Sequence, residues 1–346
     1  MSVAAAPAAP RGLATTQRRR QLAWLGALGA LLVVCVLSLC VGTESVSPAT
    51  VFRALFEGSD RGNAWIVRDL RVPRTVLGLT VGAALGLSGA LIQAVSRNPL
   101  ADTQVLGINA GAGLAVVAAI AFLGLHGIWT YLWFAFAGAA AAMVLVQVVG
   151  SAGRSPATPV RLLLAGVAIG AVMDGISFTI RIGSPRTFDS TRFWEAGALD
   201  ERSLSVAATV APFVLVGALL ALLVSRNLNA VALGDDLATS VGGNPLRTQL
   251  VSFLAVTLLA GAAVAGAGPI GFVGLMVPHA VRWVVGPDWR WILAFSPVVG
   301  ATILLLADVL GRVVVPPAEL PAGIVTAFVG APLLIWLIRR DRGAGA

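Results

Sequence analysis

Long apolar stretches alternate with short polar segments along most of the chain. About 20 apolar residues cross a bilayer as a helix, so the pattern predicts an all-α polytopic membrane protein of about ten transmembrane helices. Residues 22–338 would form the transmembrane domain, and residues 1–21 and 339–346 would form two cytoplasmic tails. The apolar stretches lie near residues 22–42, 76–95, 104–124, 129–150, 161–181, 206–225, 249–267, 270–285, 291–311 and 321–338.

The composition supports this prediction and argues against enzymatic chemistry. Hydrophobic residues make up 58% of the chain and charged residues 12%, whereas about a quarter of the residues in a soluble domain are charged. The short connections leave no room for a nucleotide-binding or catalytic domain. The zinc-protease, phosphate-loop and nucleophile-elbow motifs do not occur in the sequence. We therefore expect no catalytic residue, metal or cofactor in this chain.

The arginines predict the orientation in the membrane. All 24 basic residues are arginine. With the N-terminus inside, the cytoplasmic segments hold 14 arginines and five acids, and the outer segments hold 10 arginines and nine acids. This bias follows the positive-inside rule and places both termini in the cytoplasm. The arginines are scattered in short loops and are not massed with aromatic residues, which argues against a nucleic-acid partner.

A short polar segment between the predicted spans 206–225 and 249–267 has the pattern of a separate helix. A glycine interrupts the chain, two carboxylates follow at the favourable N-terminal end of the new helix, and leucine and valine four residues apart share one face. A helix of about two turns is marginal alone in water, so we expect another cytoplasmic protein to cover its apolar face. The segment comprises Gly234, Asp235, Asp236, Leu237, Ala238, Val241 and Gly242.

Three arginines on the predicted outer side run against the usual charge distribution. Arg71 and Arg74 precede the second span, and Arg312 ends the ninth. They could contact lipid headgroups, or they could form a cationic rim that receives an acidic partner. Asp308 lies four residues before Arg312 on the same helical face, which predicts an ion pair between them.

Several motifs after residue 65 together resemble the FecCD-type permease family of iron–siderophore and cobalamin ABC importers. The resemblance covers nearly all of the remaining chain, in order. The motifs that carry it include Arg71-Val-Pro-Arg74, Arg97-Asn-Pro-Leu-Ala-Asp102, Leu106-Gly-Ile-Asn109-Ala-Gly111, Leu233-Gly-Asp-Asp-Leu-Ala238, Gly268-Pro-Ile-Gly-Phe-Val-Gly274 and Leu320-Pro-Ala-Gly-Ile-Val-Thr326.

The resemblance implies a type II importer-like permease of ten spans in the bacterial cytoplasmic membrane. It implies a dimer with an identical or related permease, two ATP-binding subunits inside and an extracytoplasmic substrate-binding protein outside. Arg71, Arg74 and Arg312 match the positions that meet the binding protein, and residues 234–242 match the coupling helix that contacts the ATPase. Ferric siderophores are the commonest cargo of the family, with cobalamin or haem as alternatives.

Three polar residues are candidates for the translocation pathway. Asn109 lies among glycines in the third span, and Asp174 lies in the outer half of the fifth span, which lines the pathway in the family. An intramembrane carboxylate faces a bundle interior or a watery cavity, so Asp174 could contact cargo or bond to a neighbouring helix. Glu195 stands near the outer gate, where the family generally has an apolar residue.

Two other functional classes are weaker fits to the sequence. An ion-coupled secondary transporter also uses broken helices around a midplane site, but it needs several carboxylates deep in the bundle, and Asp174 alone gives thin support. It would also leave the segment 234–242 unexplained. A membrane-bound enzyme or receptor scaffold would need an active-site constellation, which the sequence does not contain.

Overall fold

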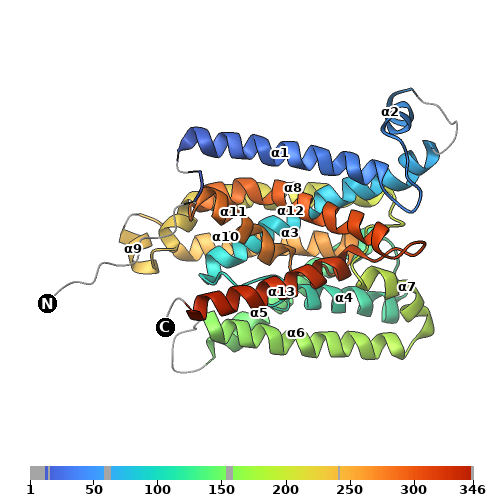
Figure 1. Ribbon diagram of the computed structural model, residues 1–346. Coiled ribbons are helices and arrows are strands. Elements are labelled where there is room, and N and C mark those ends of the chain that lie inside the picture. Colours follow the sequence, from blue (N-terminus) through green and yellow to red (C-terminus); the bar gives the residue numbers. More distant parts are fainter. Residues whose placement is uncertain (1–11, 15, 58–63, 153–158, 241, 344–346) are drawn as a thin grey trace.

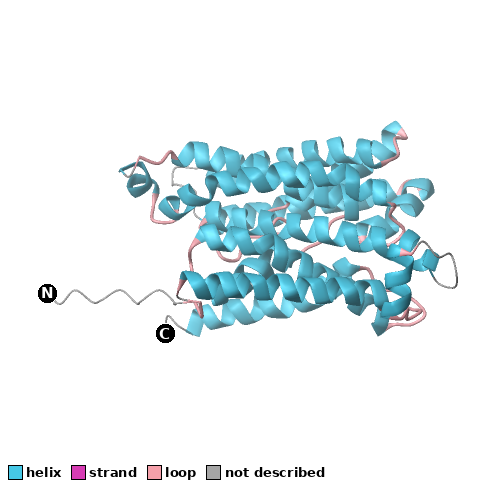
Figure 2. Cartoon of the chain, turned by 90° about the horizontal axis from the view of Figure 1, so that it is seen from above, coloured by secondary structure: helices cyan, strands magenta, loops and turns pink. Residues whose placement is uncertain are grey.

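The structure, a computed structural model, is a bundle of helices that run nearly side by side (Figure 1), and a view turned by 90° shows the same arrangement (Figure 2). It describes residues 12–14, 16–57, 64–152, 159–240 and 242–343. Within these ranges the chain forms helices and connections and no strand. The prediction of an all-α membrane protein is confirmed.

Each of the ten predicted spans corresponds to a helix. These helices are α1 (Gln17–Cys40), α3 (Val72–Ser96), α4 (Ile108–Leu123), α5 (Ile128–Ser151), α6 (Pro159–Ile182), α8 (Leu204–Val231), α10 (Pro245–Ala267), α11 (Val273–Val285), α12 (Trp289–Val314) and α13 (Ala322–Gly343). The connections add α2 (Pro48–Phe56), α7 (Pro185–Glu195), α9 (Asp235–Ser240) and a π-helical turn, η1 (Ile66–Arg71), that leads into α3.

The helices differ in length more than the sequence predicts. In the described residues, seven are long and apolar enough to cross a membrane, whereas α4, α11 and the apolar part of α13 are shorter. The predicted span 270–285 loses its first turn because Gly268 and Pro269 end α10 and a loop continues to Phe272 before α11 begins. Irregular backbone of this kind is tolerated in a membrane protein where it is buried within the protein.

Helix α3 lies at the centre of the bundle and packs through glycines. A Cβ atom on Gly86 would lie 2.3 Å from the Ser296 carbonyl oxygen of α12, and one on Gly89 would lie 2.2 Å from the backbone of Gly274 in α11. Small residues let membrane helices approach to backbone contact. The glycines of the sequence therefore fix the position of α3 against its two neighbours.

The bundle has two distinct ends. Helix α9, the start of α1 and the end of α13 lie at one end, which we call the α9 end, and α2 and α7 lie at the other, which we call the α7 end (Figure 1). Helix α1 runs along the outside of the bundle (Figure 1). Each end carries one of the candidate partner sites predicted from the sequence.

Candidate functional sites at the two ends of the bundle

The segment between α8 and α10 forms the short helix predicted from the sequence. Gly234 has a φ of +117°, which favours glycine, and α9 follows from Asp235 to Ser240. Ala238 is buried against the bundle, whereas Leu237 is 57% exposed. Val241, the second predicted apolar anchor, lies outside the described residues.

Two features of this site are absent from the sequence-based prediction. Leu233, just before Gly234, is 71% exposed and extends the apolar surface of α9. The Arg97 guanidinium at the end of α3 forms an ion pair with the Asp235 carboxylate. Leu233 could have been noticed as the first residue of its motif, but Arg97 is 138 positions from Asp235, and no local pattern links them.

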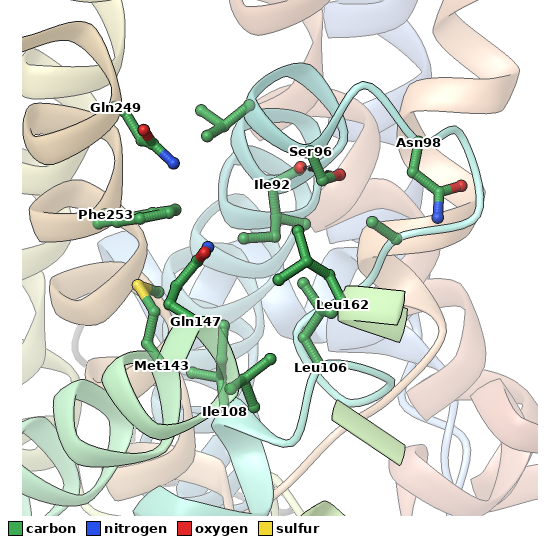
Figure 3. A pocket seen from close by; sticks show the side chains of 13 residues that line it. Ile92, Ser96, Asn98, Leu106, Ile108, Met143, Gln147, Leu162, Gln249 and Phe253 are labelled. Atoms are coloured by element: carbon green, nitrogen blue, oxygen red, sulfur yellow. Dashed lines mark hydrogen bonds between the residues drawn. The ribbon is translucent and has the colours of Figure 1, made fainter. Parts of the chain in front are cut away.

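A hollow of about 700 Å³ lies beside α9, between the ends of α3 and α5 and the start of α10. A small cavity of about 50 Å³ adjoins it deeper in the bundle (Figure 3), and Ser96, Gln147 and Gln249 line both. The side chains of Gln147 and Gln249 project into the small cavity from α5 and α10 (Figure 3). The region behind α9 is therefore less tightly packed than the centre of α3.

The three arginines that the sequence predicts on the outer side gather at the α7 end and are largely buried. The Arg71 Nη1 donates to the Leu39 carbonyl at 2.8 Å. The Arg74 Nη2 donates to Asp308 Oδ1 at 2.7 Å, and its Nη1 donates to Glu319 Oε2 at 2.5 Å. None of these interactions with the protein itself was predicted from the sequence.

Arg312 completes a buried network around the same carboxylate. Its Nη2 pairs with Asp308, which confirms the predicted ion pair, and its Nη1 donates to the Ser38 carbonyl at 2.7 Å. Asp308 and Arg312 are 0% and 2% exposed. The Ser38 and Thr75 hydroxyls lie 2.8 Å apart beside them. The network ties α1, α3 and α12 together.

Arg71, Arg74 and Arg312 line one cavity of about 590 Å³ that opens at the α7 end. Its lining also contains four acids, Glu44, Asp200, Glu201 and Glu319. The cavity is therefore of mixed charge and not the purely cationic rim that the sequence suggested.

Asn109 and Asp102 hold the loop between α10 and α11. The Asn109 Nδ2 donates to the Ile270 carbonyl at 3.1 Å, and the Phe272 backbone N–H donates to Asp102 Oδ2 at 3.2 Å. Both side chains are buried, at 1% and 2% exposure. Asn109, a predicted pathway residue, therefore supports this loop from within the bundle.

The other two predicted pathway residues lie near each other. Glu195, at the end of α7, forms an ion pair with Arg181 of α6. Burial raises the pKa of the Glu195 carboxyl, Arg181 opposes the rise and Asp174 adds to it. Asp174 itself is exposed on α6. An apolar hollow of about 640 Å³ adjoins Glu195 and runs along Ile324 and Phe328 of α13.

Comparison with known proteins identifies the family. A family model described as the FecCD transport family matches residues 30–340. The ferric enterobactin transport system permease protein FepD of Escherichia coli (strain K12) is 46% identical over 328 residues, which cover 94% of this chain and 98% of that protein. The Fe(3+)-citrate import system permease protein YfmD of Bacillus subtilis (strain 168) is 40% identical over 306 residues, covering 88% and 91% of the two chains.

A third relative and a solved structure agree with this match. The hemin transport system permease protein HmuU of Yersinia pestis is 36% identical over 322 residues, with 91% and 96% coverage. A metal-chelate type ABC transporter solved in an inward-facing conformation superposes with a TM-score of 0.77 at 27% identity, covering 92% of this chain and 99% of that one. ABC transporter permeases work in complexes with ATPase and permease partners. The chain therefore belongs to the FecCD transport family and is a multi-pass membrane permease subunit, not an enzyme.

Proposed function

We propose that this chain is the permease subunit of an ATP-driven importer that carries ferric siderophores across the cytoplasmic membrane. The observation that carries the proposal is the 46% identity to a ferric enterobactin permease over almost the full length of both chains. Haem is the second candidate cargo, because a hemin permease is 36% identical with similar coverage. No cofactor is needed by the chain itself, since ATP would be hydrolysed on the partner subunits.

The assembled transporter would contain two ATP-binding subunits, one for each permease. The α9 end is the proposed contact of this chain with its ATP-binding subunit. Leu237 of α9 and Leu233, just before that helix, expose a small apolar surface. Glycines bound α9, and the Arg97–Asp235 ion pair joins it to α3. An amphipathic helix that inserts its apolar face into a groove is a common mode of recognition. This assignment places α9 and both termini in the cytoplasm, in agreement with the arginine distribution.

The cavity at the α7 end is the proposed docking site of an extracytoplasmic substrate-binding protein. Arg71 and Arg312 are held by backbone carbonyls, so they are positioned in advance for an acidic partner. Arg74 is paired with Glu319, a half-buried carboxylate at the cavity wall, and this partner could be exchanged for another carboxylate. An acidic side chain from the binding protein could replace Glu319, and complementary charge would speed the encounter.

A second permease copy or paralogue would cover the face formed by α6 and α13. Only 17% of the residues in the most apolar stretch of α6 are buried, compared with 78% in that of the helix that contains α3. This face carries Asp174 and adjoins the hollow next to Glu195, so a dimer would enclose both carboxylates along a shared pathway. Asn109 would support the pathway wall indirectly, through the loop that contains Ile270.

The proposed cargo can be tested with the partner binding protein and reconstituted vesicles. Ferric enterobactin, ferric citrate and haem would each be titrated against the binding protein by fluorescence quenching, and the tightest ligand would be offered to proteoliposomes that contain the complete transporter. We expect ATP-dependent uptake of a ferric siderophore. Uptake of haem alone would favour the second candidate, and uptake without ATP would contradict the importer assignment.

A further inference from the structure

An apolar groove on the outside of the bundle lies apart from both partner sites. It runs between α1, α8 and α12, helices that lie together at the edge of the bundle (Figure 1), and it has a volume of about 600 Å³. Trp24 of α1 forms part of one wall, where its Nε1 donates to the Ala294 carbonyl of α12 at 3.3 Å. Leu25 and Leu222 also line the groove and are 59% and 50% exposed.

Each of the three helices carries an exposed arginine at the α9 end of this groove. Arg18 precedes the lining residue Gln21 by three positions, and Arg290 precedes Ala294 by four. Residues three or four apart on a helix share one face, so both arginines lie one turn beyond the apolar wall.

Helix α8 repeats the arrangement in the opposite chain direction. Arg226 follows the lining residue Leu222 by four positions, and Leu222 follows Ala218 by four. Because α8 runs toward α9, Arg226 lies at the same end of the groove as Arg18 and Arg290. Three helices therefore bring three guanidinium groups to one end of an apolar groove.

The charge at this end is positive. Arg18, Arg226 and Arg290 form no ion pair within the part of the chain that the structure describes. Asp288, the residue before α12, is an acid at this end of the groove. Its Oδ2 lies 3.6 Å from the Arg20 Nη1, and its Oδ1 accepts a hydrogen bond from the Asn229 side chain. Its carboxylate is thus already shared between two other side chains.

We propose that this groove binds a phospholipid with an anionic headgroup. An acyl chain would lie along Trp24, Leu25 and Leu222, and the headgroup would meet the three arginines. Arginine matches phosphate geometry well and is weakly hydrated, and basic pockets between transmembrane helices bind acidic headgroups. A second copy of this chain is a poor occupant, since a symmetric contact would bring the same cationic groups toward each other.

The proposal can be tested by native mass spectrometry of the purified full-length chain. The wild type would be titrated with phosphatidylglycerol and with phosphatidylcholine that has the same acyl chains. A triple variant, R18Q/R226Q/R290Q, would be compared with a control, R19Q/R247Q/R339Q, which removes the same charge from exposed arginines at the same end of the bundle. The six positions are exposed, so we expect all variants to fold.

We expect the wild type and the control to retain phosphatidylglycerol at least about tenfold more strongly than the triple variant does, given the attraction that each arginine contributes. Phosphatidylcholine should show no such difference. Equal retention by the two variants would overturn the proposal.

A further variant, Ala218→Trp, fills the groove without changing charge and should also lower lipid retention. Loss of the dimer with unchanged lipid retention would assign the groove to a second copy instead. Glycerol phosphate, which lacks acyl chains, should not displace the lipid, and displacement would contradict a role for the groove.

Discussion

The guanidinium of Arg97, at the end of α3, forms an ion pair with the carboxylate of Asp235, the first residue of α9. Helix α3 is the most buried of the spanning helices, and its other end carries Arg74, which is paired with Asp308. The short helix at one end of the bundle is therefore connected to the central helix as well as to its chain neighbours α8 and α10. We expect this connection to carry movement of α9 into the bundle.

Exchanging the charges of that pair tests the connection. Arg97→Asp or Asp235→Arg alone places like charges together and should lower transport-coupled ATPase activity, whereas the double exchange should restore most of it. The two side chains are 38% and 65% exposed, so the free energy of unfolding should change by less than about 1 kcal/mol. Activity that falls equally in the single and double variants would contradict the connection.

The ATPase should bind Leu237 of α9 and Leu233, which lies just before that helix. Replacing Leu233 and Leu237 by Asp puts charge on the apolar surface and should abolish co-purification of the ATP-binding subunit while membrane insertion stays normal. Leu13→Asp is the matched control, because Leu13 is 79% exposed at the same end of the bundle. Unchanged pull-down of the ATPase by the double variant would remove α9 from that interface.

Asp308 should be essential for stability. Asp308→Asn leaves the buried Arg312 without its charged partner and leaves Arg74 with Glu319 alone, and breaking a buried ion pair costs about 3–5 kcal/mol. Glu319→Gln, at the partly exposed end of the same network, should cost no more than about 1 kcal/mol. Thermal unfolding in detergent compares the two. A small loss of stability with Asp308→Asn would show that the network contributes little to the fold.

Gly268 should tolerate no side chain. Its φ is +81°, and a Cβ atom there would lie 1.7 Å from the Trp194 carbonyl oxygen. Gly268→Ala must displace the backbone of one segment or the other, which should cost at least about 3 kcal/mol in the free energy of unfolding. Gly29→Ala is the control, since nothing lies within 4 Å of its added atom. Equal melting temperatures for the two variants would contradict this packing.

The sequence predicts the spans well because burial in a membrane imposes long apolar stretches, and each predicted stretch has its helix. It also predicts the Asp308–Arg312 pair and the short helix after Gly234, which depend on residues close together in the chain. It does not predict the contacts of Arg71 with Leu39 or of Arg97 with Asp235. These contacts join segments that are distant in sequence, and nothing in a local pattern indicates which helices will be neighbours.

The late start of α11 is another feature that the local sequence pattern does not predict. The hydropathy pattern predicts spans near 249–267 and 270–285, separated by only two residues, whereas α11 begins at Val273. The position of the loop depends instead on what surrounds it: Asn109 and Asp102 bind its backbone, and Trp194 leaves no room beside Gly268. Those partners come from three other parts of the chain.

The most direct test of the importer assignment is uptake of radioactive iron, as ferric enterobactin, into proteoliposomes that contain the permease, its ATP-binding subunits and its binding protein. We predict uptake that requires ATP and the binding protein, that persists in the Leu13→Asp control and that is lost when Leu233 and Leu237 are both replaced by Asp. Uptake that continues without ATP, or that is undiminished in the double variant, would contradict the account.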